Sequence, residues 1–180
     1  MIKKMAVTAF VLMVAATAVM AQSNSTPWTF QFQAGYNTSS KWMDSGWLTS
    51  AGLAYDFGNQ WALRTDLAYF EGKVKDVGAK DHLWTLMVAP QYTYQLNESN
   101  DLYFFAGLGV AKRDSLSFML DPATPVSIGS ETQWAGQAGF GYRHFFNKNI
   151  GLSLQATYNH FAFADKIDNG DVRLGIVAKF

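Results

Sequence analysis

The sequence contains no cysteine, and its charged residues are few and balanced. Without cysteine, the chain can form no disulfide, no thiolate nucleophile and no lipid-modified cysteine. Charged residues make up 16% of the chain, with 14 basic and 14 acidic side chains. This balance lacks the basic excess that marks nucleic-acid-binding proteins, so we expect no nucleic-acid partner.

Long apolar runs are also missing, apart from one near the N-terminus. Two lysines there precede an uncharged apolar run that ends in small residues at Ala21. A short charged region, an apolar stretch and a small-residue cleavage site are typical of a secretory signal peptide. A transmembrane anchor is the alternative, but the run is short, rich in alanine and followed by no basic stop. We therefore predict a cleaved signal peptide over residues 1–21 and one exported domain over residues 22–180.

Beyond residue 21, no stretch approaches the roughly 18 apolar residues of a membrane helix. The sequence is instead rich in aromatic residues, with 6 Trp, 8 Tyr and 14 Phe. Successive residues of a strand point to opposite faces, so an apolar–polar alternation indicates a strand with one apolar face. Eight segments alternate in this way, each bounded by turn residues: 28–37, 46–57, 60–70, 82–96, 101–113, 131–146, 150–161 and 171–180.

The two faces of these segments differ in kind. One face is aliphatic in the middle and aromatic at both ends, as with Trp28 and Tyr36 in the first segment and Trp61 and Tyr69 in the third. The other face carries Gln, Thr, Ser, Gly and a few opposed charges, and lacks the many Lys and Glu residues of a soluble surface. Aromatic residues gather at the two interfaces of membrane barrels, so we favour a membrane barrel over a soluble sandwich or barrel.

The connections between the segments alternate in length. The links after the second, fourth and sixth segments are short (FGNQ, NESN and NKN), whereas the others are longer, up to DSLSFMLDPATPVSIG. Outer-membrane barrels have short periplasmic turns and longer external loops, and a sheet in lipid must close on itself. The sequence therefore predicts an all-β fold, an eight-stranded antiparallel up-and-down transmembrane β-barrel in a bacterial outer membrane.

The chain resembles the small eight-stranded outer-membrane barrels of the OmpA/OmpX type, which include adhesion and invasion proteins. The resemblance covers nearly all of residues 22–180 and depends on the strand number, the loop asymmetry and the final segment VRLGIVAKF. In such families the last strand, ending in Phe, is read by the barrel-assembly machinery. The resemblance thus implies that machinery as a partner, and it assigns the assembly signal to Phe180 with Val172, Leu174 and Ile176.

The polar face, which would line the lumen, carries the concentrated charge of the chain. Arg64 and Asp66 lie two residues apart on one predicted strand, and Gln91, Gln137 and Gln155 are expected at a similar depth. Buried charges need partners, and eight strands leave room inside only for side chains. We therefore expect a charge network that plugs the lumen, with a selective pore lined by charge as the alternative. The charged residues of inward parity are Asp56, Arg64, Asp66, Arg113, Glu131, Arg143, Asp171, Arg173 and Lys179.

The three histidines, His82, His144 and His160, share the outward parity, and no pair has the spacing of metal ligands. Lipid A deacylases are also eight-stranded barrels, with a His-x-Ser pair on a late strand. In the corresponding stretch of this chain, Ala162 stands where the serine would be, so His160 has no hydroxyl to activate. We expect no catalytic, cofactor-binding or metal-binding residues, and a deacylase-like enzyme is the least favoured alternative.

The longest connection carries Phe118, Met119 and Leu120 beside two prolines that stiffen it. An exposed apolar patch of this kind can mark a partner site, or the loop can fold back over the barrel mouth or onto lipopolysaccharide. We therefore expect a structural or surface-interaction role, in adhesion or envelope integrity. The expected partners are outer-membrane lipid, lipopolysaccharide and a host or envelope protein. Passive transport of small solutes is the alternative.

Overall fold

The computed structural model of the protein describes residues 27–38, 44–73, 75, 80–114, 116–121, 124–163 and 167–180. The predicted signal peptide lies outside the described residues. Within these ranges, no helix is long and apolar enough to cross a membrane. The strands are β1 (Trp28–Asn37), β2 (Gly46–Gly58), β3 (Trp61–Lys73), β4 (Lys80–Asn97), β5 (Asn100–Arg113), β6 (Leu116–Asp121), β7 (Thr124–Ile128), β8 (Glu131–Phe145), β9 (Ile150–Phe161) and β10 (Ile167–Lys179).

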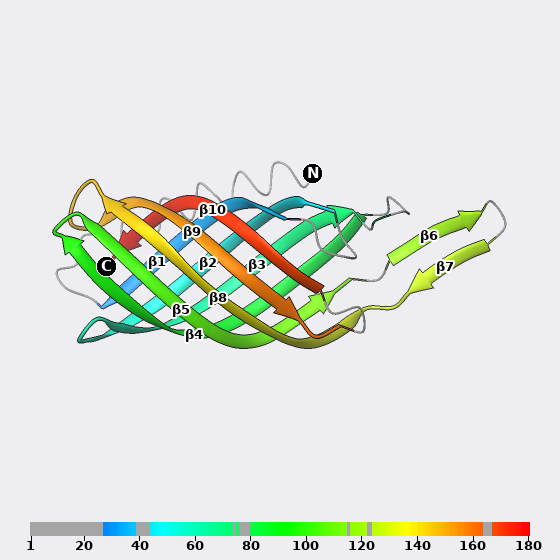
Figure 1. The fold of residues 1–180 in the computed structure, drawn as a ribbon, viewed down its shortest axis with the longest axis horizontal. Coiled ribbons are helices and arrows are strands. Elements are labelled where there is room, and N and C mark those ends of the chain that lie inside the picture. Colours follow the sequence, from blue (N-terminus) through cyan, green and yellow to red (C-terminus); the bar gives the residue numbers. More distant parts are fainter. Residues whose placement is uncertain are drawn as a thin grey trace.

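Eight of these strands form one closed antiparallel barrel (Figure 1). The order around its wall is β1, β10, β9, β8, β5, β4, β3 and β2. Each of the eight predicted segments corresponds to one barrel strand, so the predicted fold class is confirmed. The first and last strands close the ring, with Phe32 opposite Ile176 and Thr29 opposite Lys179.

The side chains of the barrel strands alternate between the lumen and the outer face, as the period of a strand requires. Along β3, Ala62, Arg64 and Asp66 are buried in the lumen, whereas Leu63 and Leu67 are exposed on the outer face. Charged residues are thus buried while leucines are exposed, the reverse of a soluble protein. This distribution agrees with a barrel whose outer face contacts lipid.

The two ends of the barrel differ in their connections. At the end that carries Phe180, short turns join β2 to β3, β4 to β5 and β8 to β9. The first of these turns has Gly58, Asn59 and Gln60 in the left-handed region, with φ of 83°, 54° and 72°, which Gly and Asn tolerate best. In the second, the Asn97 side chain accepts a backbone N–H at 3.0 Å. The longer connections lie at the opposite end, which we call the loop end.

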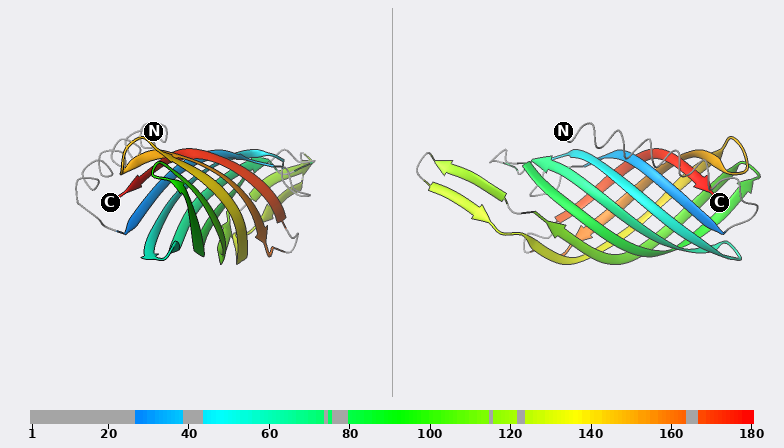
Figure 2. Two further views of the ribbon diagram at one scale, coloured as in Figure 1. Left: turned by 60° about the vertical axis from the view of Figure 1, so that its left-hand side comes forward. Right: turned by 180° about the vertical axis from the view of Figure 1, so that it is seen from behind.

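The longest connection contains a β-hairpin, which we did not predict. Strands β6 and β7 pair with Phe118 opposite Val126 and Met119 opposite Pro125. They extend beyond the barrel at the loop end (Figures 1 and 2). Proline is tolerated on an edge strand, because one side of such a strand donates no N–H to a neighbour. The side chains of the predicted interaction residues Phe118, Met119 and Leu120 lie outside the described part of the structure.

Candidate functional site: the filled lumen and the outer face

Four arginines and four aspartates are buried in the described part of the lumen, and each arginine is paired with one aspartate. All eight side chains are at most 5% exposed. Because the formal charge of this set is zero, every buried ion has its counterion inside the barrel. The N–O distances are 2.5 Å for Arg64–Asp66, 2.6 Å for Arg173–Asp171, 2.7 Å for Arg113–Asp81 and 3.6 Å for Arg143–Asp101.

Arg64 and Asp66 form the centre of a layer that spans the lumen. Arg64 donates to Asp66 from Nε at 2.5 Å and from Nη2 at 2.8 Å, and to Gln155 Oε1 from Nη2 at 2.7 Å. Its guanidinium carbon lies 4.5 Å from the centroid of the Phe105 ring. Gln137 adds a longer contact, 3.5 Å from Nε2 to Asp66. Side chains from β3, β5, β8 and β9 thus meet in one place.

Tyr103 fills the lumen beside this layer and is fully buried. Its hydroxyl donates to Gln155 Oε1 at 3.0 Å and contacts Ser153 Oγ at 3.0 Å. A Cβ atom added at Gly141 would lie 2.3 Å from the Tyr103 ring, far inside van der Waals contact. Glycine at position 141 is therefore what allows the tyrosine to lie across the lumen.

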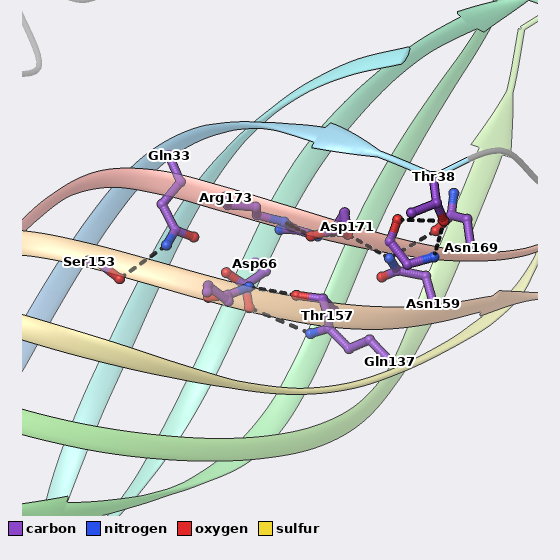
Figure 3. Close-up of polar contacts among 12 residues, drawn as sticks. Gln33, Thr38, Asp66, Gln137, Ser153, Thr157, Asn159, Asn169, Asp171 and Arg173 are labelled. Atoms are coloured by element: carbon purple, nitrogen blue, oxygen red, sulfur yellow. Dashed lines mark hydrogen bonds and ion pairs between the residues drawn. The ribbon is translucent and has the colours of Figure 1, made fainter. Parts of the chain in front are cut away.

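A second polar layer lies nearer the loop end, on β9 and β10 (Figure 3). Arg173 donates to the Asp171 carboxylate from Nε at 2.6 Å and from Nη2 at 2.8 Å. Asn159 Nδ2 donates to Asp171 at 2.7 Å and to Asn169 at 3.0 Å. As with Arg64 and Asp66, a spacing of two residues along one strand puts the two opposite charges on the same face.

The other two ion pairs join neighbouring strands near the two ends of the barrel. Arg143 lies opposite Asp101 in the β5–β8 register, near the C-terminus. Arg113 donates from Nε to Asp81 at 2.8 Å, near the loop end. Asp81 and Asp101 were absent from our predicted inward set, although both share the parity of buried neighbours. Each lies at the start of its strand, where few residues precede it, so the alternation there was too short to predict which way the side chain faces.

Some charged residues of the predicted inward set are not enclosed. Asp56 is exposed, and Glu131 and Lys179 are only partly buried, because all three lie at the ends of strands. Gln91, expected in the central layer, is buried but donates to Thr93 at 3.1 Å instead. The ends of the lumen are thus more open than parity alone predicts, while its middle is filled.

The inner face is not polar throughout, which corrects our expectation. At the loop end a cluster of large apolar side chains points inward and is buried, and we call it the apolar cap. The Phe161 ring lies 5.9 Å from that of Phe70 and 6.4 Å from that of Phe163, between centroids. The cap therefore adds apolar contacts inside the lumen at the loop end, beside the Arg113–Asp81 pair. Its large members are Leu48, Phe70, Leu83, Met87, Phe161, Phe163 and Ile167.

The outer face carries the predicted aromatic residues at both ends. Near the C-terminus, Trp28 packs against Tyr55 with 4.8 Å between ring centroids. At the loop end, Tyr69 packs against Trp84 at 4.7 Å. Exposed aliphatic side chains such as Leu67 lie between the two rows. The outer face therefore has the apolar band with aromatic borders that suits a lipid bilayer.

A polar cluster lies on the outer face of β9 and β10 at the loop end. His160 Nδ1 is 2.6 Å from Asp168 Oδ1, which also accepts a hydrogen bond from the Tyr158 hydroxyl at 3.0 Å. Two residues after the histidine, Ala162 donates its backbone N–H to the Trp134 carbonyl at 3.0 Å. The cluster thus contains a histidine, His160, with an acidic partner, Asp168. The position where a deacylase would have its nucleophilic serine is occupied by Ala162, which has only a methyl group.

The other two histidines lie apart from this cluster. His82 Nδ1 forms a hydrogen bond with the Tyr69 hydroxyl at the loop end, and His144 contacts Asn100 at 2.9 Å near the opposite end. Over the ranges that the structure describes, no group of three or more His, Asp or Glu residues could hold a metal ion.

The C-terminal residue continues the pairing of β10 with β1. Phe180 donates its N–H to the Trp28 carbonyl at 3.0 Å, and Trp28 donates to the Phe180 carbonyl at 3.2 Å. Val172 and Leu174 are exposed on the outer face, whereas Ile176 is partly buried. The role of these residues as an assembly signal stays a prediction.

The chain is similar to a known family and to several solved structures. The family model described as "Outer membrane protein beta-barrel domain" matches residues 7–180. Neisserial surface protein A is 16% identical, with a TM-score of 0.70 over 88% of this chain and 100% of that one. Ail, the attachment invasion locus protein of Yersinia pestis, is 18% identical, with a TM-score of 0.55 over 85% and 96%.

The outer membrane enzyme PagL is also similar, with 19% identity and a TM-score of 0.53 over 84% of this chain and 99% of that one. At these identities the structural likeness shows the fold alone. A sequence search among curated proteins gives no match.

Proposed function

This chain belongs to the outer membrane protein beta-barrel domain family, and from that premise we propose that it is a non-conducting surface protein. Its barrel would anchor the chain in the outer membrane. Its loop end, above all the β6–β7 hairpin, would bind a protein partner in adhesion or in maintaining the envelope. A cleaved signal peptide over residues 1–21 would export it.

The filled lumen is the observation that carries this proposal. Four neutralised ion pairs and the apolar cap occupy the space through which a solute would have to pass. Opening that path would require separating buried opposite charges, which costs several kcal/mol for each ion left without its partner, on the order of 3–5. We therefore assign the function to the surface of the barrel and not to transport through it.

The hairpin is the element of the loop end that is best placed to contact a partner. It extends past the barrel wall (Figure 2), and its two strands have free edges to which an extended segment could add. Its sequence carries three consecutive large apolar residues, Phe118, Met119 and Leu120. The name of Ail, an attachment invasion protein, describes a role of this kind for another barrel of the same fold.

We do not assign an enzymatic function. The His160–Asp168 pair could orient an imidazole, but Ala162 has no hydroxyl that the imidazole could deprotonate. Lipid A incubated with the purified protein should keep all its acyl chains. Release of a fatty acid by the protein, but not by a His160→Ala variant, would contradict this assignment.

The test of the proposed function is a replacement of the hairpin in cells. Residues 115–128 would be replaced by a two-residue Asn-Gly turn, and a matched control would replace residues 74–79, the connection between β3 and β4, in the same way. A non-adherent bacterial strain displaying each form would be tested on cultured epithelial cells and on immobilised laminin and fibronectin. We expect the full chain to confer binding, the hairpin variant to lose about tenfold or more, and the control to keep it.

Two results would contradict the proposal. One is binding by the hairpin variant that equals that of the full chain. The other is a combination of two findings. The strain that displays the full chain binds no better than the strain without it, and deleting the chain from its own cells leaves the envelope intact. All forms must show the same change in gel migration on boiling, which shows that each barrel is folded before it is boiled.

A further inference from the structure

The hairpin of β6 and β7 projects from the loop end along the long axis of the barrel (Figures 1 and 2). Among the described strands, β6 and β7 pair with each other alone. Each of the two strands therefore has an outer edge, whose backbone groups face away from the hairpin. Whether such an edge can pair with a further strand depends on its N–H donors, its charges and its prolines.

The register of the hairpin shows which backbone groups lie on the outer edges. Met119 is opposite Pro125, and proline has no N–H to donate. This pair therefore cannot exchange two backbone hydrogen bonds. Since hydrogen-bonded and non-hydrogen-bonded pairs alternate along an antiparallel ladder, the neighbouring pair of Phe118 and Val126 is hydrogen-bonded. The pairs whose backbone groups point outward are Met119–Pro125 and Ser117–Ser127.

The two outer edges differ in what they offer a further strand. On β7, Pro125 occupies an outward position and leaves no N–H there. On β6, the outward residues Ser117 and Met119 each have an N–H and a carbonyl. The sequence of β6, LSFMLD, has no proline or lysine, and its single charge is Asp121 at the end of the strand. The β7 edge is thus interrupted, whereas the β6 edge is open to pairing.

From this arrangement we propose that the β6 edge pairs with the β6 edge of a second copy of the chain on an opposing cell. Two identical edges can pair antiparallel about a two-fold axis. With Phe118 of the two copies opposite each other, Ser117 of each copy meets Met119 of the other, and each of these pairs exchanges two backbone hydrogen bonds. The inference rests on the proposed function, because it needs the loop end to lie outside the cell.

The composition of β6 favours a second copy over an unrelated strand. Short apolar segments with little charge and no proline are those that pair with identical segments. The two-fold register also keeps like charges apart, because the Asp121 positions of the two copies lie on opposite sides of the Phe118 pair. At about 3.4 Å per residue, they are about 20 Å from each other. Since Pro125 interrupts the other edge, the assembly closes at two copies and does not grow into a fibre.

The direction of the hairpin decides where the second copy lies. Each hairpin continues the axis of its barrel (Figure 2), so antiparallel pairing puts the two barrels at opposite ends of the shared sheet. Two barrels in one membrane would instead present their β6 strands parallel to each other. The pairing therefore joins copies in two facing membranes. A single contact of this length is weak, but many copies on two cells bind together and strengthen the attachment.

A disulfide trap tests the pairing directly, since the chain has no cysteine of its own. Phe118→Cys puts the two new thiols in a non-hydrogen-bonded pair, where the Cα atoms are about 4.5 Å apart and a disulfide can form. Val126→Cys is the matched control, because Val126 is opposite Phe118 on β7. Its two copies would be three strand spacings apart, about 14 Å, which is too far for a disulfide.

Each cysteine variant would be displayed by two bacterial strains that carry different epitope tags on the chain and lack O-antigen, so that their membranes can approach. The two strains are mixed and oxidised. We expect Phe118→Cys to give disulfide-linked dimers that contain both tags, and Val126→Cys to give none. Dimers with one tag only, no dimers from a folded Phe118→Cys barrel, or equal amounts from both variants would overturn the inference. The change in gel migration on boiling shows which barrels are folded.

Sedimentation of the same strains, displaying the chain without added cysteine, gives a second measurement. Ser117→Pro removes an outward N–H of β6 and should abolish the clumping and settling of cells. Ser127→Pro, directly opposite on the β7 edge, should leave both unchanged, because neither substitution removes a hydrogen bond inside the hairpin. Cells without the chain should stay out of the clumps, and their inclusion would show that the partner is not a second copy.

These outcomes are separate from those that test the proposed function. Suppose that the variant without residues 115–128 loses binding to epithelial cells, laminin and fibronectin, and that Phe118→Cys gives no dimers with both tags. The pairing of copies is then overturned and the proposed function stands. Dimers with both tags, together with unchanged binding of the hairpin variant to these surfaces, would instead support the pairing and contradict the role of the hairpin toward other partners.

Discussion

Replacing Asp66 by asparagine removes one buried negative charge and leaves the size of the side chain unchanged. In the wild type, Arg64 donates two hydrogen bonds to this carboxylate and one to Gln155. Its Nη1 atom already has no hydrogen-bond partner among the described residues. The substitution therefore leaves a guanidinium that is 2% exposed without its counterion.

The cost follows from burial. Removing one partner of a buried ion pair destabilises a protein by about 3–5 kcal/mol, because the remaining charge stays out of water. The asparagine oxygen still accepts one hydrogen bond from Arg64, so we expect the lower end, about 3 kcal/mol. Replacing both partners, Arg64→Met with Asp66→Leu, should restore most of this loss, because no unpaired charge then remains.

Urea unfolding of the barrel in phospholipid vesicles, followed by tryptophan fluorescence and gel migration, measures these differences. Glu71→Gln is the control, since the Glu71–Lys80 pair is exposed and should change stability by about 0.5 kcal/mol or less. A free energy of unfolding for Asp66→Asn within about 1 kcal/mol of the wild-type value would contradict this cost. A double variant that is no more stable than Asp66→Asn would contradict it as well.

Three further outcomes are expected. Gly141→Ala should cost about 1–3 kcal/mol, because the new methyl group overlaps the Tyr103 ring. Gly136→Ala, with its nearest atom at 3.7 Å, should be close to neutral, and equal unfolding midpoints for the two variants would refute this. Phe161→Ala opens the apolar cap and should cost about 3–5 kcal/mol in the same assay; a loss below 1 kcal/mol would mean that the cap is loosely packed. Phe180→Ala should lower the amount of barrel in the outer membrane of cells while the purified variant still refolds in detergent, and unchanged cellular levels would remove the assembly role from this residue.

Alternation of apolar and polar residues was sufficient to predict the eight barrel strands and the burial of Arg64 and Asp66, because period two decides the face of each side chain. It could not decide which charges meet. The Arg113–Asp81 pair joins two strands, so it depends on their register and tilt, which no single segment encodes.

The apolar cap and the hairpin went unpredicted for related reasons. Phe70 and Phe161 have the parity of inward-facing residues, but alternation predicts only which face of the strand a side chain joins. It does not predict whether the part of the lumen lined by that face is polar or apolar. Pro122 and Pro125 interrupted the alternation across two short strands, and among the described strands β6 and β7 pair with each other alone.

Single-channel recording in planar bilayers tests the central claim most directly, namely that paired charges and the apolar cap close the lumen. The folded wild type should give no conductance above the bare bilayer across the usual range of voltages and salt. Stable, stepwise conductance from preparations that show a single folded band would contradict the closed lumen and, with it, the assignment of the function to the surface of the barrel.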